Sequence, residues 1–287
     1  MTKHIEYIYQ ELTALHHPDK TKALQQFDTV LFKHIGHIMH NKVASFWLGL
    51  SGARFLKVPG DKHTKKYYRQ IARLSVAFAF VADYAFVVLG GALKRKERIS
   101  GRFADVLSNL YLCSTVLKFY QDQDCPEGDL PLVHWACQQT IYQAQHALLV
   151  LFQLLPFKPI AFGLKAIVFP AGKSYSPPGD KLIHQTATIL LNDSATRDRL
   201  TQGIYINEIE NDATGRIECA FKAVLAALPV EQKIRNAQKS KKLPKGLGET
   251  VLKQALDRQI INEDEVALVE EAERTRRLAI MVDDFPA

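Results

Sequence analysis

Cysteine, glycine and proline are scarce in this chain of 287 residues. It has four cysteines, and no two of them have the CxxC spacing of a metal or redox motif. The fifteen glycines and twelve prolines fall in a few stretches, which is typical of long helices separated by defined breaks rather than of many short strands. The first residues are polar and aromatic rather than continuously apolar, so no secretory leader is expected and a reducing cytoplasm is predicted.

The charge balance names no partner by itself. With 37 basic and 30 acidic residues the formal net charge is +7, which would attract any polyanion without choosing among nucleic acid, anionic lipid and phosphorylated cofactors. The basic run at residues 94–98 has no interleaved aromatic residues and belongs to no nucleic-acid motif. A solvated helix end is therefore favoured there, and nucleic acid is not predicted as a partner.

The clearest pattern is a hydrophobic spacing that alternates between three and four residues. It places one apolar stripe on a helix, and such a stripe needs a partner helix to cover it. The first stripe is Leu74, Phe78, Val81, Ala85, Val88 and Ala92; the second is Phe103, Leu107, Leu110, Ser114 and Leu117; the third is Cys137, Ile141, Ala144, Leu148, Leu151 and Leu155.

A fourth helix is predicted from Phe27 towards Trp47, because Phe27, Leu31, Ile35 and Ile38 continue the same spacing. Short connections make consecutive helices antiparallel neighbours, so an antiparallel helical bundle is expected over residues 1–155, with its core from about residue 27. Asp129 is expected to cap the helix that follows it, since its carboxylate can accept free amide hydrogens of the first turn.

The texture changes beyond Leu155. Five prolines fall among apolar residues between 156 and 178, which predicts an irregular apolar connector. Asn262 with Glu265 three residues later fits a capping box. The expectation is an all-α fold whose second part, residues 156–287, packs on the bundle. It consists of the connector and shorter helices at about 181–191, 217–228, 249–258 and 264–279.

One segment, residues 76–93, is apolar enough to suggest a membrane span. Asp83 lies in its middle, and a central aspartate costs about 2.5 to 3.5 kcal/mol on insertion scales. Gly90 and Gly91 weaken a span further. A buried bundle helix in which Asp83 is hydrogen-bonded is therefore the favoured interpretation.

No catalytic, cofactor-binding or metal-binding residue is predicted. His34, His37 and His40 lack an acidic or cysteine ligand at metal spacing, so surface or core histidines are favoured over a zinc site. Residues 172–174 match the end of a P-loop, but Ile167 stands where its first glycine is required. No nucleophile with a base, and no pair of carboxylates, is convincing.

Residues 148–169 are a candidate interaction surface, because their apolar side chains are interrupted only by a glycine, a glutamine, two lysines and prolines. Lysines beside exposed apolar side chains suit an interfacial membrane anchor. A loop packed on the bundle is the alternative, and a contact with another protein would use the same residues. The candidate membrane or partner surface consists of Phe157, Phe162, Lys165, Ile167 and Phe169.

Five long segments carry a resemblance to a known family: FDTVLFKHIGHIMHNKVASFWLGL (27–50), LGGALKRKERISGRFADVLSNLYL (89–112), DLPLVHWA (129–136), VFPAGKSYSPPGDKL (168–182) and IINEDEVALVEEAERTRRLAIMVDDF (260–285). They resemble the C-terminal region of the large bacterial acyl-coenzyme A dehydrogenases that start fatty-acid β-oxidation. The resemblance covers nearly the whole chain. Residues 68–155 also resemble the extra helical bundle of mitochondrial very-long-chain acyl-coenzyme A dehydrogenase, which helps that enzyme to dimerise and to sit on the membrane.

The resemblance implies an FAD-dependent dehydrogenation of acyl thioesters in which a glutamate removes the α-proton. In the family, that glutamate and the flavin-binding core lie upstream of the part represented here. No catalytic or flavin-contacting position is therefore transferred, and this chain alone is expected to bind no cofactor and to be inactive. The implied partners are a catalytic dehydrogenase core, a second copy in a homodimer and an anionic membrane surface, at a location that is cytoplasmic or peripheral on the inner membrane. The alternative is a stand-alone helical interaction protein without dehydrogenase activity.

Overall fold

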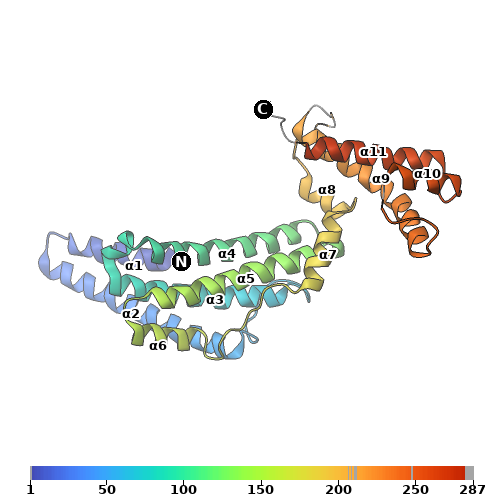
Figure 1. Ribbon diagram of the computed structural model, residues 1–287. Helices are drawn as coiled ribbons and strands as arrows, with labels where there is room; N and C mark the ends of the chain where they lie inside the picture. Colours follow the sequence, from blue (N-terminus) through green and yellow to red (C-terminus); the bar gives the residue numbers. More distant parts are fainter. Residues whose placement is uncertain (1, 206, 208, 210–211, 247, 282–287) are drawn as a thin grey trace. The chain divides into compact units, whose positions relative to one another are not determined.

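The computed structural model describes residues 2–205, 207, 209, 212–246 and 248–281, with side chains from Glu6 onward. Within these residues all regular structure is helical, so the predicted all-α fold is confirmed (Figure 1). The chain forms two compact units, Met1–Ala187 and Thr188–Ala287, and each is described by itself. Residues 282–285, which end the last segment of the family resemblance, lie outside the described part.

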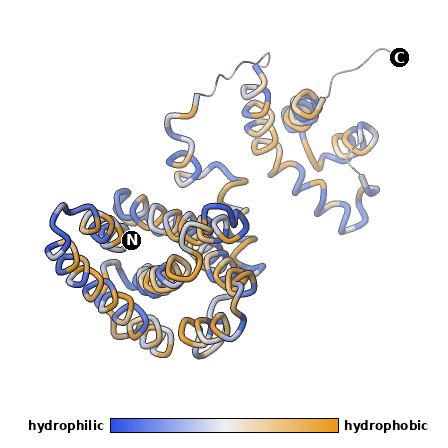
Figure 2. The backbone as a smooth tube through the Cα atoms, turned by 90° about the vertical axis from the view of Figure 1, so that its left-hand side faces the viewer, coloured by the Kyte–Doolittle hydropathy of each residue, from blue (hydrophilic) through white to orange (hydrophobic). Residues whose placement is uncertain are grey.

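The first unit is a bundle built mainly on three long helices. Its members α3, α4 and α5 lie side by side (Figure 1), α2 packs on α3, α1 packs on α2, and α6 packs on α5 and α2. Figure 2 views this bundle nearly along its helices. The helices are α1 (Thr2–Leu15), α2 (Lys20–Ser51), α3 (Lys65–Leu89), α4 (Glu97–Asp122), α5 (Leu130–Leu154) and α6 (Lys158–Val168), with short 3-10 turns η1 (Gly90–Arg95) and η2 (Glu127–Asp129).

Every residue of the stripe predicted on α5 lies in the core of the bundle. All six of its residues, from Cys137 to Leu155, are at most 1% exposed. On α3 the predicted residues Leu74, Phe78, Val81 and Ala85 are buried as well. Asp129 stands at the N-cap position of α5, but its side chain makes no capping hydrogen bond, contrary to prediction.

The stripe on α4 differs from the prediction by a partial rotation of the helix. Leu110 and Leu117 are buried as expected, whereas Leu107 and Ser114 face solvent. With 3.6 residues per turn, two neighbouring stripes share members, and the packing partner decides which stripe is covered. The buried face of α4 is Ile99, Val106, Leu110, Cys113, Leu117 and Tyr120.

The connector also differs in part from the irregular segment that was expected. Residues 158–168 form helix α6, with Pro159 in the first turn, where its missing amide hydrogen costs nothing. Ala161, Leu164 and Val168 point into the bundle core, so packing continues across residue 155 and the first unit extends to Ala187. Whether the C-terminal region packs on the bundle stays a prediction.

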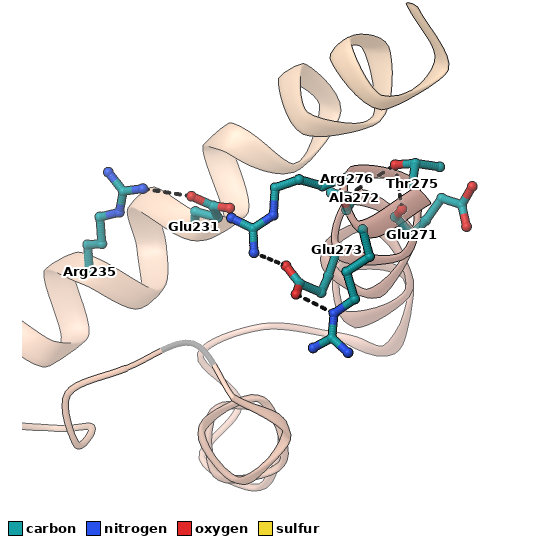
Figure 3. A network of polar contacts seen from close by, with 8 residues as sticks. Glu231, Arg235, Glu271, Ala272, Glu273, Thr275 and Arg276 are labelled. Atoms are coloured by element: carbon teal, nitrogen blue, oxygen red, sulfur yellow. Dashed lines mark hydrogen bonds and ion pairs between the residues drawn. The ribbon is translucent and has the colours of Figure 1, made fainter. Parts of the chain in front are cut away.

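The second unit consists of α8 (Ala195–Thr201), α9 (Ala213–Lys239), α10 (Glu249–Asp257) and α11 (Glu263–Ile280), while α7 (Asp180–Leu190) crosses the boundary between the units. The predicted capping box of Asn262 and Glu265 is confirmed. Helix α9 continues through Pro229, where it was expected to end, because Val230 and Ile234 beyond the proline are buried in the core of this unit. The surface of the second unit carries ion pairs between residues of the same helix. Examples are Arg235 with Glu231 on α9 and Arg276 with Glu273 on α11 (Figure 3).

Candidate functional site

The predicted surface residues of the connector divide into three groups. Phe157 and Lys165 are exposed on or beside α6, and Phe162 is 75% exposed. Ile167 is half-buried. Phe169 is buried, with its ring edge-on to Phe152 at a centroid distance of 6.3 Å, so its expected place on the surface is wrong.

The amphipathic character of α6 explains this division. Its inward positions, Ala161, Leu164 and Val168, are three and four residues apart, which turns the residues between them towards solvent. Phe169 follows the helix and continues its inward side. The exposed side of α6 therefore presents Phe162 together with Lys158 and Lys165.

A groove lies between α5, α6 and the loop after α6, with a volume of about 490 Å³. Three lysines reach it, Lys158 and Lys165 from α6 and Lys173 from the loop, and His146 of α5 joins them. We name it the lysine groove. The remainder of its wall is Leu149, Val150, Phe152, Gln153, Ala161 and Phe162.

The loop that carries Lys173 is held by hydrogen bonds to a side chain of α5. The side-chain oxygen of Gln145, which is buried, accepts hydrogen bonds from the backbone amides of Ser174 at 2.8 Å and Tyr175 at 3.1 Å. Its amide nitrogen donates to the Tyr175 carbonyl at 2.8 Å. Arg73 of α3, also buried, donates to the Tyr175 hydroxyl at 3.2 Å and lies over its ring. Residues 172–174 thus belong to an anchored loop.

Helix α2 carries a second apolar surface, which sequence reasoning missed. Its buried positions are polar or small, namely His34, Asn41, Ser45 and Gly49. Of the predicted stripe, Phe27, Leu31 and Ile38 are half-buried and Ile35 is exposed. Most of the other large apolar side chains of the helix point outward and are about half exposed or more. This outward face of α2 consists of Phe32, Ile35, Met39, Val43, Phe46, Trp47 and Leu50.

Polar contacts and a close approach determine which way α2 faces. The side chain of Asn41 donates to the buried Asp83 of α3 at 3.3 Å, as the hydrogen-bonded interpretation of Asp83 requires. His34 contacts Glu11 of α1 at 2.8 Å. A Cβ atom on Gly49 would come within 2.8 Å of Pro170, so only glycine permits this contact. The signal in the sequence was a helix whose apolar residues occupied more than one stripe.

The three histidines of α2 have separate environments. His34 is buried and stacks on Tyr7 at 5.4 Å, His37 is half-buried and contacts Asn41, and His40 is exposed. Among the described residues, no three histidine, cysteine or acidic side chains gather in a way that could hold a metal ion.

A polar cluster joins α3 to α5 inside the bundle. The Tyr67 hydroxyl lies 2.9 Å from His134 Nδ1 and accepts a hydrogen bond from Gln138 at 3.3 Å. Burial raises the pKa of Tyr67 above its usual range. Burial, and then the charges of Lys66 and His63, lower the pKa of His134. The Nδ1 atom of neutral His134 can accept a hydrogen bond from the Tyr67 hydroxyl. The cluster therefore links α3 to α5 structurally.

One helical stretch of the described chain, Lys65–Arg95, is long and apolar enough to cross a membrane by length and composition. In the bundle, its residues Leu74, Val81 and Asp83 are buried completely. Only about a third of its most apolar part is buried, and Phe86 and Val87 are exposed, so the burial that the sequence predicted for this helix is partial.

The family model for the C-terminal region of acyl-CoA dehydrogenase, bacterial type, matches residues 4–285. The chain belongs to this family. The resemblance drawn from the sequence segments is thereby confirmed, and the all-α fold is that of an acyl-CoA dehydrogenase C-terminal domain. No solved structure matches the chain.

Acyl-CoA dehydrogenases use FAD in general, which poses the question whether the grooves of this domain fit it. A flavin needs an enclosed apolar slot with polar groups that fix its orientation. The groove between α1 and α2, about 470 Å³ in volume, offers glutamines and threonines but no cation for the pyrophosphate. The lysine groove is open to solvent. Neither groove fits FAD, and no chemical step through the flavin is assigned to this domain.

Proposed function

We propose that this acyl-CoA dehydrogenase domain is an accessory module of an FAD-dependent enzyme that acts in the first step of fatty-acid β-oxidation. It packs against a catalytic part that carries the flavin and the base, and it docks that part on an anionic membrane surface. The supporting observation is that the first unit has two exposed apolar surfaces, the outward face of α2 and the exposed side of α6.

The outward face of α2 suits a protein partner. Seven large apolar side chains, two of them phenylalanine and one tryptophan, line one side of a single long helix. Contiguous apolar surface of this kind marks interaction sites, and aromatic residues and methionine are enriched at their centres. Either the catalytic part or a second copy of the domain would cover this face.

The exposed side of α6 suits a lipid surface. Phe157 and Phe162 supply apolar area, and Lys158 and Lys165 stand beside them. An interfacial helix of this type inserts its aromatic side chains at the level of the headgroups while its lysines are attracted to anionic lipid. The proposed location is accordingly peripheral on the inner membrane.

Flotation of the purified chain with vesicles tests the membrane part. The chain is expected to float with vesicles of phosphatidylcholine and phosphatidylglycerol and to remain behind with phosphatidylcholine alone. Phe157→Ser with Phe162→Ser should abolish flotation, whereas Tyr205→Ser, at an aromatic residue that is equally exposed in the second unit, should not. Failure of the unaltered chain to float with anionic vesicles would remove membrane docking from the proposal.

Reconstitution tests the partnership with a catalytic part. The chain alone should show no flavin absorbance and no dye reduction with palmitoyl-coenzyme A, and a separately produced dehydrogenase core should bind it through the outward face of α2. Phe32→Ser with Trp47→Ser should weaken that complex. A monomeric chain that binds no core would support the alternative, a stand-alone helical interaction protein, while turnover by the chain alone would contradict the accessory role.

A further inference from the structure

The lysine groove gathers positive charge without a compensating acid. Lys158, Lys165 and Lys173 line it together with His146. Between Asp129 and Asp180 the sequence has no aspartate or glutamate, so the segments that form the groove contribute no counter-charge. None of the three lysines forms an ion pair within the part of the chain that the structure describes.

Their positions come from rigid elements. Lys158 and Lys165 are seven residues apart on α6, which places them on the same side two turns apart. The ammonium group of Lys158 donates to the Gln153 carbonyl at the end of α5. Lys173 stands on the loop that Gln145 holds by three hydrogen bonds and that Arg73 holds through Tyr175. Three like charges that line one groove favour the binding of an anion there.

The rest of the groove is apolar and continues onto the exposed side of α6. Leu149 and Val150 line the wall from α5, and Phe162 lines it from α6 while remaining 75% exposed. A small inorganic anion would use only the lysines and leave this wall uncovered. An anion attached to an acyl chain would use both parts, since apolar contact adds to its affinity roughly in proportion to the area removed from water.

We propose that the lysine groove binds the phosphate group of an anionic phospholipid, with Lys158, Lys165 and Lys173 around the phosphate oxygens and Phe162 against the acyl chains. The site rests on the proposed membrane function and names the lipid group that it recognises. Lysine is suited to phosphate as a compact charge whose three hydrogens can each be donated to an oxygen.

Lysine footprinting of the full chain with a soluble short-chain phosphatidic acid tests the groove without a membrane. Acetylation of Lys158, Lys165 and Lys173 is expected to slow when the lipid is added, whereas Lys62, Lys181 and Lys253, which are exposed elsewhere, should react as before. Equal protection by inorganic phosphate or by coenzyme A, at the same concentration, would overturn the assignment to a phospholipid. Unchanged reactivity of the three groove lysines would overturn the site.

Two triple variants that lose the same charge distinguish binding in the lysine groove from general electrostatic attraction between the protein and the lipid. Changing Lys158, Lys165 and Lys173 together to glutamine should weaken lipid binding roughly hundredfold, since each lysine near an anionic surface contributes about one kcal/mol and the three together about three. The same change at Lys62, Lys181 and Lys253 removes equal charge and should have little effect, and arginine at the three groove positions should retain binding. All six side chains are exposed, so each variant should fold.

The two proposals fail in different ways. If the glutamine variant still floats with anionic vesicles and the groove lysines are never protected, membrane docking survives and the groove site is wrong. If the soluble lipid protects the groove lysines but the chain does not float, the groove site stands and membrane docking is wrong.

Discussion

Helices α5 and α2 show how similar apolar patterns lead to opposite outcomes. Both carry apolar residues at helical spacing, and both contact α3 and α6. On α5 the stripe from Cys137 to Leu155 is buried completely. On α2 the buried positions are His34, Asn41, Ser45 and Gly49, and seven large apolar side chains face outward. An apolar stripe therefore shows that a helix needs a partner, but it does not show whether that partner belongs to the same chain.

The difference between α5 and α2 follows from the residues that each helix contacts in the bundle. Helix α5 contacts α3, α4 and α6, and its buried side chains are apolar except for Gln145. Helix α2 meets the buried carboxylate of Asp83, the Glu11 side chain and the ring of Pro170. These neighbours require an amide, an imidazole and a glycine, so polar and small residues had to face inward.

The largest effect that would sharpen this comparison is expected in the α5 stripe. Leu148→Ala removes a side chain that is fully buried and should lower the free energy of unfolding by about 2 to 5 kcal/mol, because a cavity replaces it. Leu112→Ala, at an exposed position of α4, should change it by less than about 0.5 kcal/mol. Urea unfolding followed by circular dichroism measures both, and similar losses would contradict the assignment of the core.

A smaller loss is expected at the polar contact beneath α2. Asn41→Ala removes a donor from buried Asp83 and should lower the free energy of unfolding by about 1 to 3 kcal/mol, since the carboxylate loses part of its compensation for burial. His40→Ala, next to it on the exposed side, is the control. A loss at His40 as large as that at Asn41 would show that α2 is turned differently.

The link between α3 and α5 should make stability depend on pH. Because the folded protein lowers the pKa of His134, the unfolded chain binds its proton first as pH falls below 6.5, the ordinary histidine value. The free energy of unfolding should therefore decline below pH 6.5. His134→Gln should flatten this part of the profile relative to the unaltered chain. A steeper decline in that variant would mean that the sign of the shift is wrong.

The smallest effect on stability is expected on the outward face of α2. Each of the replacements Phe32→Ser, Val43→Ser and Trp47→Ser should change the free energy of unfolding by less than about 0.5 kcal/mol, because these side chains are already exposed. The three are combined in one variant. Binding of an apolar fluorescent dye should fall at the same time. A large loss of stability would show that this face is covered within the chain.

The fold was largely predictable because long periodic helices are the strongest local signal. The α5 stripe, the α3 stripe up to Ala85 and the capping box at Asn262 agree with the structure. The stripe on α4 was assigned one position away from its buried face at Leu107 and Ser114, because two adjacent stripes share residues. The helix expected at about 217–228 extends to Lys239, because the residues that follow Pro229 are buried in the core of the second unit.

The candidate surfaces were less predictable. Phe157, Phe162 and Lys165 are exposed, whereas Phe169 belongs to the core, since α6 ends with its inward side leading into that residue. Lys173 was dismissed with an incomplete P-loop, yet the loop held by Gln145 brings it to the groove of Lys158 and Lys165. No spacing in the sequence connects residue 145 with residues 174 and 175.

By itself, the sequence determined that this acyl-CoA dehydrogenase domain is made of helices, which stripe of α5 is buried, and where α7, α10 and α11 lie to within one residue at each end. These features depend on local capping and on a helical period that each segment carries within itself. Only the tertiary structure decided which side of α2 and α4 is covered and which lysines share a groove, because those outcomes depend on neighbours that are distant along the chain.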